Sequence, residues 1–243
     1  MGAYSVIDRR TPAGTSLAPE LYPDGYVAVI DKPYGWTSAD AVRKIKFGLQ
    51  KRYGLRNVKV GHAGTLDPLA TGVLLVCVGK ATKVAEALQA ERKEYVADVT
   101  FGATTPSFDK EKDLDAVYRY EHMTPLMIDD VLGSMQGEQM QMPPVYSAKY
   151  VDGVRAYERV RQGEEVELKA SPIVIYGTRV LSYEPPVLKV EIQCSKGTYI
   201  RAFARDLGAA LDSGAHLSAL VRTASGGFGL ENALSISDFE TFY

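Results

Sequence analysis

The sequence predicts an α+β fold, with one domain over residues 25–243 that follows an N-terminal arm over residues 1–24. Strand-like and helix-like segments both occur, but they do not alternate with the regular spacing of βαβ units. The 243 residues are 46% hydrophobic and 24% charged, which is typical of a globular protein with a substantial core. This length also allows two small domains.

The domain is expected to begin with a strand and a helix. Residues 1–24 are rich in Pro, Gly, Ser and Ala, so we expect them to form a loose arm. The apolar run Gly25–Ile30 predicts the first strand. Thr37 followed by Asp40 predicts the start of a helix, because both side chains can cap its first turn, and this helix should run to about Leu49.

The remaining elements follow from hydrophobic periodicity. In chain order they are Val73–Val78 (a buried strand or the core of a short helix), Lys83–Ala90 (a helix), Tyr95–Phe101, Ile173–Tyr183 and Leu188–Cys194 (strands), and about Thr198–Leu211 (a helix). In the last strand the even-numbered residues are apolar and the odd-numbered residues between them are polar. The even-numbered side chains should therefore face the core.

The cysteines and histidines argue against a disulfide framework and a zinc site. Cys77 and Cys194 both lie in apolar runs, and no Cys/His cluster accompanies them. We expect two buried free thiols, a reducing cytoplasm, and no metal or other cofactor. The first 20 residues lack the apolar core of a secretory signal, and no run approaches the roughly 20 apolar residues that span a bilayer.

Charge is distributed unevenly along the chain, although the net charge is only −2. Between Ala41 and Leu66 there is no acidic residue; the basic residues of this stretch are Arg43, Lys44, Lys46, Lys51, Arg52, Arg56 and Lys59. Residues 109–138 instead hold eight acidic and three basic residues. This separation predicts a face that binds a polyanion, while each charged run alone also fits a solvated surface.

One carboxylate, Asp67, lies in a Gly- and Thr-rich segment at the end of the basic stretch. The segment Gly61–Gly72 holds three glycines and one proline, so its backbone is expected to turn tightly. Such a loop can present a side chain from a rigid frame. We interpret Asp67 as a reactive acid beside a polyanion-binding surface; the alternative is a tight loop with an incidental surface carboxylate.

Residues 139–165 differ from the rest of the chain. They begin with an irregular Met- and Pro-rich stretch and continue with an aromatic residue among basic ones. Lys149, Arg155 and Arg159 are the basic residues that we select as RNA contacts, because phosphate binding and stacking need this composition. An amphipathic surface helix with solvated arginines explains the same residues equally well.

The segment Gly61–Gly72 resembles the motif G-H-x-G-T-L-D-P-x-A-x-G of the TruB family of tRNA pseudouridine synthases. Further segments resemble family motifs in the same order: residues 31–38 (D-K-P-x-G-x-T-S), 93–95 (K-x-Y), 197–201 (G-T-Y-I-R) and 215–223. The resemblance covers roughly residues 26–239. It implies a pseudouridine synthase fold, with a mixed, mostly antiparallel sheet flanked by helices and a thumb-like insertion at about 139–165.

The resemblance also implies a reaction. The enzyme would convert uridine to pseudouridine at position 55 in the T-loop of tRNA, without a cofactor, and we expect it to act as a monomer on the T-arm. Asp67 would attack covalently or steer proton transfer, as carboxylates do in glycosyl chemistry. Arg201 would keep this carboxylate ionised, and Tyr199 would brace both side chains.

The target uridine must leave its stack before it can react. By resemblance, Tyr95 would stack on the flipped base and relay a proton, and Leu220 would form the opposite wall. His62 would help to fill the space that the base leaves in the RNA. Lys32 would either position the Asp67 loop or contact a phosphate. From residue type alone, a core role for Tyr95 and a structural role for His62 are the simpler interpretations.

Two departures from the family pattern affect what we expect. Thr105-Pro106-Ser107-Phe108-Asp109 replaces the usual T-x-T-x-D, but Ser107 keeps a hydroxyl, so only the local turn geometry should change. The sequence given ends at Tyr243, so we expect no C-terminal PUA domain and RNA affinity that comes from the catalytic domain and the thumb. The alternatives are a guide-RNA-dependent enzyme, a noncatalytic RNA-binding protein, and a nucleoside hydrolase.

Overall fold

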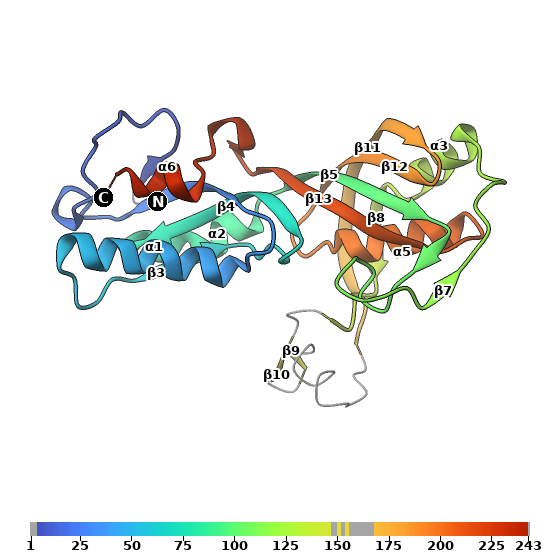
Figure 1. Cartoon of the computed structure of the whole chain (residues 1–243), viewed down its shortest axis with the longest axis horizontal. Coiled ribbons are helices and arrows are strands. Elements are labelled where there is room, and N and C mark those ends of the chain that lie inside the picture. Colours follow the sequence, from blue (N-terminus) through green and yellow to red (C-terminus); the bar gives the residue numbers. More distant parts are fainter. Residues whose placement is uncertain (1–3, 147–149, 152–153, 156–167, 243) are drawn as a thin grey trace. The chain divides into compact units, whose positions relative to one another are not determined.

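The computed structural model describes residues 4–146, 150–151, 154–155 and 168–242. The chain forms two compact units: unit 1 is Met1–Tyr95 with Val221–Tyr243, and unit 2 is Val96–Leu220. Two strands, β5 (Lys93–Phe101) and β13 (Ala215–Ser225), carry the chain from one unit into the other (Figure 1).

Unit 1 is built on a sheet with the strand order β1-β2-β4-β13-β5. Its remaining strands are β1 (Ser5–Ile7), β2 (Tyr26–Lys32), β3 (Val60–Ala63), β4 (Ala70–Val78) and β14 (Phe228–Gly229). β1 pairs with β2 in parallel, whereas β2 and β3 pair antiparallel with β4. The expectation of a loose arm over residues 1–24 was therefore wrong, because residues 5–7 pair as a strand and Leu17 is buried. The arm also contains the short helix η1 (Pro19–Leu21).

Both faces of the β2–β4 pair are covered. One face packs with residues of α1 (Ser38–Tyr53) and α6 (Ile236–Glu240), and the other packs with residues of η2 (Gly79–Val84) and α2 (Ala85–Ala90). Figure 1 shows α1 along the strands of this unit. Because β4 is buried on both faces, its residues Val73–Val78 are all apolar. An unbroken apolar run has no periodicity that distinguishes a strand from a helix, so the sequence alone did not decide between them. The short helix η3 (Leu230–Asn232) precedes α6.

The predicted start of α1 is confirmed. Thr37 is the N-cap residue: its hydroxyl accepts the Asp40 backbone N–H at 3.0 Å, and its own backbone N–H donates to the Asp40 carboxylate at 2.8 Å. The helix continues to Tyr53, one turn past Leu49, and ends at Gly54 with a left-handed φ of 63°. A glycine at this position suits the left-handed C-cap, because it has no Cβ to clash.

Unit 2 has the strand order β13-β5-β12-β11-β8. Its elements include β8 (Gly137–Gln141), β11 (Ser171–Glu184), β12 (Val187–Cys194), α3 (Pro125–Ser134), α5 (Ile200–Ala210), the β6–β7 pair (Ala103–Thr104 and Ala116–Val117) and the β9–β10 pair (Tyr150–Val151 and Val154–Arg155). The even-numbered residues of β12 are fully buried, as predicted, and Cys77 and Cys194 are buried free thiols. The strands are mixed and mostly antiparallel, which confirms the α+β prediction. None of the helices in the described part of the chain has the length and apolar character needed to cross a membrane.

Candidate active site

Asp67 lies in the loop that joins β3 to β4 in unit 1, and it is half-buried. The backbone beside Asp67 is fixed by residues at the start of α1 and in the turn that precedes α1. Ser38 Oγ accepts the Leu66 N–H at 2.8 Å and donates to the Leu66 carbonyl at 3.1 Å. The Gly35 N–H donates to the Pro68 carbonyl at 2.8 Å. The residues on both sides of Asp67 are therefore held by hydrogen bonds that do not involve its carboxylate.

A second set of contacts to this loop comes from Arg222 on β13. Its guanidinium donates to the carbonyls of Val73 (2.7 Å), Gly64 (3.0 Å) and Thr65 (3.3 Å), and the residue is 1% exposed. Arg222 was not among the site residues predicted from sequence. The one signal in the sequence was a basic residue within the motif-like segment 215–223, which alone does not show what it contacts.

Lys32 lies under the same loop and is 0% exposed. Its ammonium donates to the carbonyls of Trp36 (2.6 Å), Pro33 (3.0 Å) and Pro68 (3.5 Å). Burial lowers the pKa of Lys32 to about 8, and it does so despite the opposing attraction of the Asp67 carboxylate. This geometry favours loop positioning, the first of the two roles considered for Lys32, over a phosphate contact.

The pKa of Lys32 should respond to the charge of Asp67. In the folded protein Lys32 should titrate near pH 8, and Asp67→Asn should lower this pKa further, because the attraction that favours the ammonium is lost. The measurement is the 13C chemical shift of lysine Cε against pH. Asp24→Asn is the control, since Asp24 pairs with Lys80 at the surface. An unchanged pKa in Asp67→Asn would contradict the placement of this carboxylate near Lys32.

The lowered pKa of Lys32 also determines how its contribution to the free energy of unfolding changes with pH. The folded pKa of about 8 lies below the ordinary lysine value of 10.5, so the unfolded chain binds more protons between these values. The contribution of Lys32 to the free energy of unfolding should therefore increase as pH rises from about 8 to 10.5, and it should be lost as pH falls through 8.

Two more predicted residues belong to unit 1. His62 lies on β3 opposite Val76 and is half-buried, and Tyr95 lies on β5 and is 8% exposed. Lys93, two residues before Tyr95, is buried and donates to the Gln89 and Glu91 carbonyls at 2.7 Å each, at the end of α2. The roles of His62 and Tyr95 toward a flipped base remain predictions.

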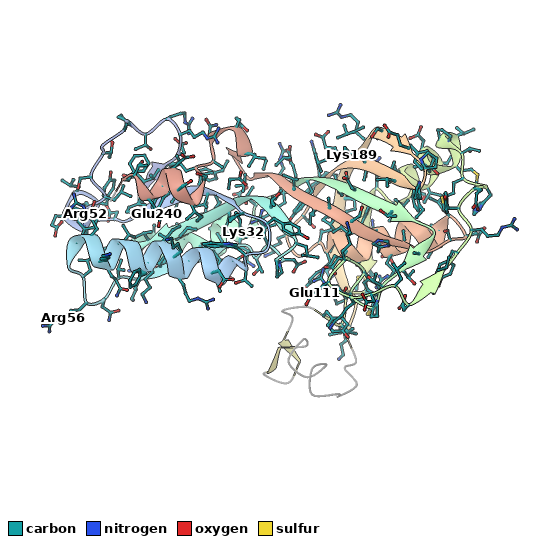
Figure 2. The ribbon with its side chains drawn as sticks, in the orientation of Figure 1. Lys32, Arg52, Arg56, Glu111, Lys189 and Glu240 are labelled. Carbon is teal, nitrogen blue, oxygen red and sulfur yellow. The ribbon has the colours of Figure 1, made fainter. Side chains whose placement is uncertain are left out.

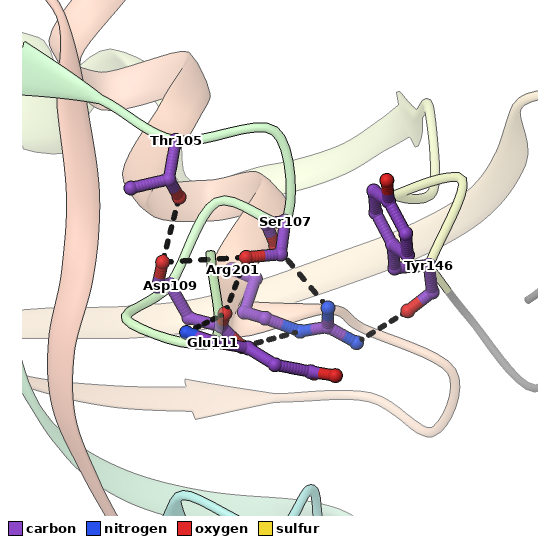
Figure 3. A network of polar contacts seen from close by, with 6 residues as sticks. All are labelled: Thr105, Ser107, Asp109, Glu111, Tyr146 and Arg201. Carbon is purple, nitrogen blue, oxygen red and sulfur yellow. Dashed lines mark hydrogen bonds and ion pairs between the residues drawn. The ribbon is translucent and has the colours of Figure 1, made fainter. Parts of the chain in front are cut away.

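Arg201 lies on α5 in unit 2 and is 4% exposed (Figure 3). Its guanidinium donates to the carbonyls of Ser107 (3.2 Å) and Tyr146 (3.0 Å), and its Nε lies 3.6 Å from an Asp109 carboxylate oxygen. The Ser107 hydroxyl donates to the Asp109 carboxylate at 2.7 Å. The serine that replaces the usual threonine of the family motif therefore uses its hydroxyl in a hydrogen bond. Phe108, between them, has a φ of 61°. The predicted pairing of Arg201 with Asp67 remains a prediction.

The other predicted residues of unit 2 are placed in part. Tyr199 is the N-cap residue of α5, and its backbone is held by Gln141 through bonds of 2.9 and 3.1 Å. Leu220 is half-buried on β13. Arg155 lies in β10, while Lys149 and Arg159 fall outside the described residues. In the described part of the chain no group of three or more His, Cys, Asp or Glu residues is arranged to hold a metal ion.

Comparison with known proteins gives matches along most of the chain. A family model described as the N-terminal domain of TruB family pseudouridylate synthase matches residues 51–200. The chain is 50% identical over 218 residues to tRNA pseudouridine synthase B of Phocaeicola vulgatus, covering 90% of this chain and 93% of that protein. It is 44% identical over 225 residues to the protein of the same name from Flavobacterium johnsoniae, covering 92% of this chain and 98% of that protein.

A solved structure is also similar. A chain in the crystal structure of a Cbf5-Nop10-Gar1 complex matches with a TM-score of 0.70 and 30% identity. The match covers 98% of this chain and 63% of that one, so the present chain spans less than two thirds of that relative.

Proposed function

The chain belongs to the TruB family of pseudouridylate synthases, and from this premise we propose that it converts uridine to pseudouridine at position 55 in the T-loop of tRNA. The observation that carries the proposal is the Asp67 loop, in which a half-buried carboxylate stands on a backbone fixed by Ser38, Lys32 and Arg222. A rigid frame of this kind is what positioned catalysis requires.

The reaction breaks the N1–C1′ glycosidic bond, turns the uracil, and forms a C5–C1′ bond; C5 loses a proton and N1 gains one, so the product is an isomer of the substrate. Asp67 serves as the nucleophile or directs the proton transfer, since a carboxylate can do either at a glycosidic centre. Tyr95 packs against the extruded base and Leu220 bounds it on the other side. Arg201 and Tyr199 keep the charge-stabilising and bracing roles that the family resemblance implies, and His62 faces the RNA.

The face that would receive the RNA backbone is the solvent side of α1 and the turn after it. The exposed basic residues there are Arg43, Lys44, Lys51, Arg52, Arg56 and Lys59. Arg52 and Arg56 lie at the end of α1 and in the following turn (Figure 2). Phe47 is 66% exposed and shares this side with Arg43 and Lys51, four residues away in each direction. A polyanion is the partner that this charge favours.

The decisive experiment incubates the purified protein with an unmodified tRNA transcript and maps pseudouridine. We expect modification at position 55 without any guide RNA, which also distinguishes the proposal from a guide-dependent enzyme. A transcript without its T-arm should not be modified. Equal modification of that transcript would overturn the substrate assignment, and no modification of either would overturn the activity.

If the basic face of α1 binds RNA, removing its charges should weaken the affinity for tRNA. Lys51→Gln with Arg52→Gln should weaken tRNA binding and reduce the salt dependence of its affinity by roughly 1–2 logarithmic units per decade of salt, because two phosphate contacts are lost. Arg155→Ala with Arg159→Ala should act in the same direction through the 139–165 segment. Fluorescence anisotropy at several salt concentrations provides the measurement.

The matched control is Arg179→Gln with Lys189→Gln, which removes the same charge from β11 and β12 in unit 2. If the control weakens binding as much as the α1 variant, binding follows net charge alone and the assignment of the face is wrong.

A further inference from the structure

We infer that Arg222 is a positioning residue for the reaction: it acts through the backbone of the Asp67 loop, and it does so together with Ser38. The inference rests on the proposed function for its reaction, but its structural basis is the set of contacts made by one buried guanidinium. Arg222 donates three hydrogen bonds to carbonyls: those of Gly64 and Thr65 belong to the loop that carries Asp67, and that of Val73 belongs to β4, which follows the loop.

The positions of these carbonyls matter. Gly64 and Thr65 come just before Asp67, and Val73 comes after the turn, so a single side chain ties the two ends of the loop together. The backbone of Arg222 is equally close, because a Cβ on Gly72 would lie 2.3 Å from the Arg222 carbonyl oxygen. β4, which follows the loop, and β13 therefore approach each other without room for a side chain between them.

An arginine suits this arrangement. Its planar group presents up to five N–H donors at fixed angles, and each of its three nitrogens donates to a different carbonyl, whereas a lysine places all its donors on one nitrogen at the end of a flexible stem. Burial lowers the pKa of Lys32 to about 8, and the nearby charge of Arg222 adds to this effect.

Ser38 supplies a further contact on the same side of Asp67 as Gly64 and Thr65. Its hydroxyl binds both backbone groups of Leu66, the residue directly before Asp67, and the side chain is buried. Arg222 and Ser38 thus fix consecutive peptide groups from Gly64 to Leu66. A displacement of about 1 Å at a reacting group lowers rates by roughly a hundredfold, so loosening this segment should slow the chemical step.

The test compares Arg222→Lys, Arg222→Gln and Ser38→Ala with wild type, and Arg179→Lys is the control, since Arg179 is exposed and pairs with Glu191 on β12. For each variant the single-turnover rate on saturating tRNA, the Kd for tRNA and the unfolding midpoint are measured. We expect all three test variants to lose about tenfold to a hundredfold in rate while the Kd changes by less than about twofold. The control should keep its rate.

Two further measurements separate positioning from a general loss of structure. Rates are taken well below the unfolding midpoint on protein shown to be folded by circular dichroism. The double variant Ser38→Ala with Arg222→Gln should lose less rate than the product of the single losses, because both residues hold the same segment. Arg222→Gln should also raise the pKa of Lys32, because the nearby positive charge is removed. This pKa can be measured without any enzymatic activity.

The inference is overturned if Arg222→Lys and Arg222→Gln keep the wild-type rate, or if their losses appear in Kd alone. Ser38→Ala provides the same comparison through a small, uncharged change if both Arg222 variants fail to fold, and a wild-type rate in that variant would then overturn the shared role. The activity of the wild-type protein on tRNA tests the proposed function by itself. If the wild type is inactive, the proposed function fails; if it is active and the variants are equally fast, only the role of Arg222 and Ser38 fails.

Discussion

Asp67→Asn should lower the rate of pseudouridine formation by at least about a thousandfold, because the amide can neither attack a sugar carbon nor accept the proton that the carboxylate would take. The change should leave the loop intact, since the adjacent hydrogen bonds of Leu66 and Pro68 come from backbone atoms and not from the Asp67 side chain. Binding of tRNA should therefore persist. The rate is measured under single-turnover conditions, together with the Kd for tRNA.

Asp24→Asn is the matched control for this change, because it removes one acidic group from the same unit at an exposed position paired with Lys80. We expect it to keep the wild-type rate. An Asp67→Asn rate within about tenfold of wild type would exclude Asp67 as the nucleophile, since loss of a nucleophile typically has a far larger effect.

Gly72→Ala should lower the free energy of unfolding by about 3–5 kcal/mol, through overpacking and backbone strain together. Gly72 has a φ of 99°, and an added Cβ would lie 2.3 Å from the Arg222 carbonyl oxygen and 2.8 Å from its nitrogen. These are backbone atoms within the sheet, so they cannot move aside as a flexible side chain would. Urea denaturation followed by circular dichroism measures the change.

Gly35→Ala measures the contribution of backbone strain alone, without the overpacking that accompanies it in Gly72→Ala. Gly35 also has a positive φ, 79°, but no heavy atom lies within 4 Å of an added Cβ. Its destabilisation should be about 1–2 kcal/mol, the usual effect of a left-handed alanine. If the two variants lose equal stability, the close approach of β4 and β13 does not contribute.

Local signals in the sequence predicted local structure well. The Thr37 and Asp40 pair predicted the helix start because both capping partners are three residues apart and need nothing else. The alternation in β12 predicted its buried face for the same reason, since side-chain direction follows from strand geometry. The position of Asp67 between β3 and β4 agrees with the tight loop that glycine and proline content predicted.

The sequence could not predict contacts between distant segments. Arg222 binds the carbonyl of Gly64, 158 positions earlier, and no local pattern in either segment encodes that pairing. The strand at residues 5–7 was missed because its partner, β2, lies beyond a Pro- and Gly-rich stretch that resembles a disordered arm. The helix α3, which begins after its N-cap residue Thr124, was not predicted.

The long separation between Gly64 and Arg222 has a consequence for biosynthesis. On a ribosome that adds about 5–20 residues per second, the guanidinium that ties down the Asp67 loop is made roughly 8–30 s after that loop. Throughout that interval unit 1 lacks its second chain segment, Val221–Tyr243, and so its final strand and helix. A nascent chain would therefore carry the acid without its support, and the enzyme would become competent only once translation has passed β13.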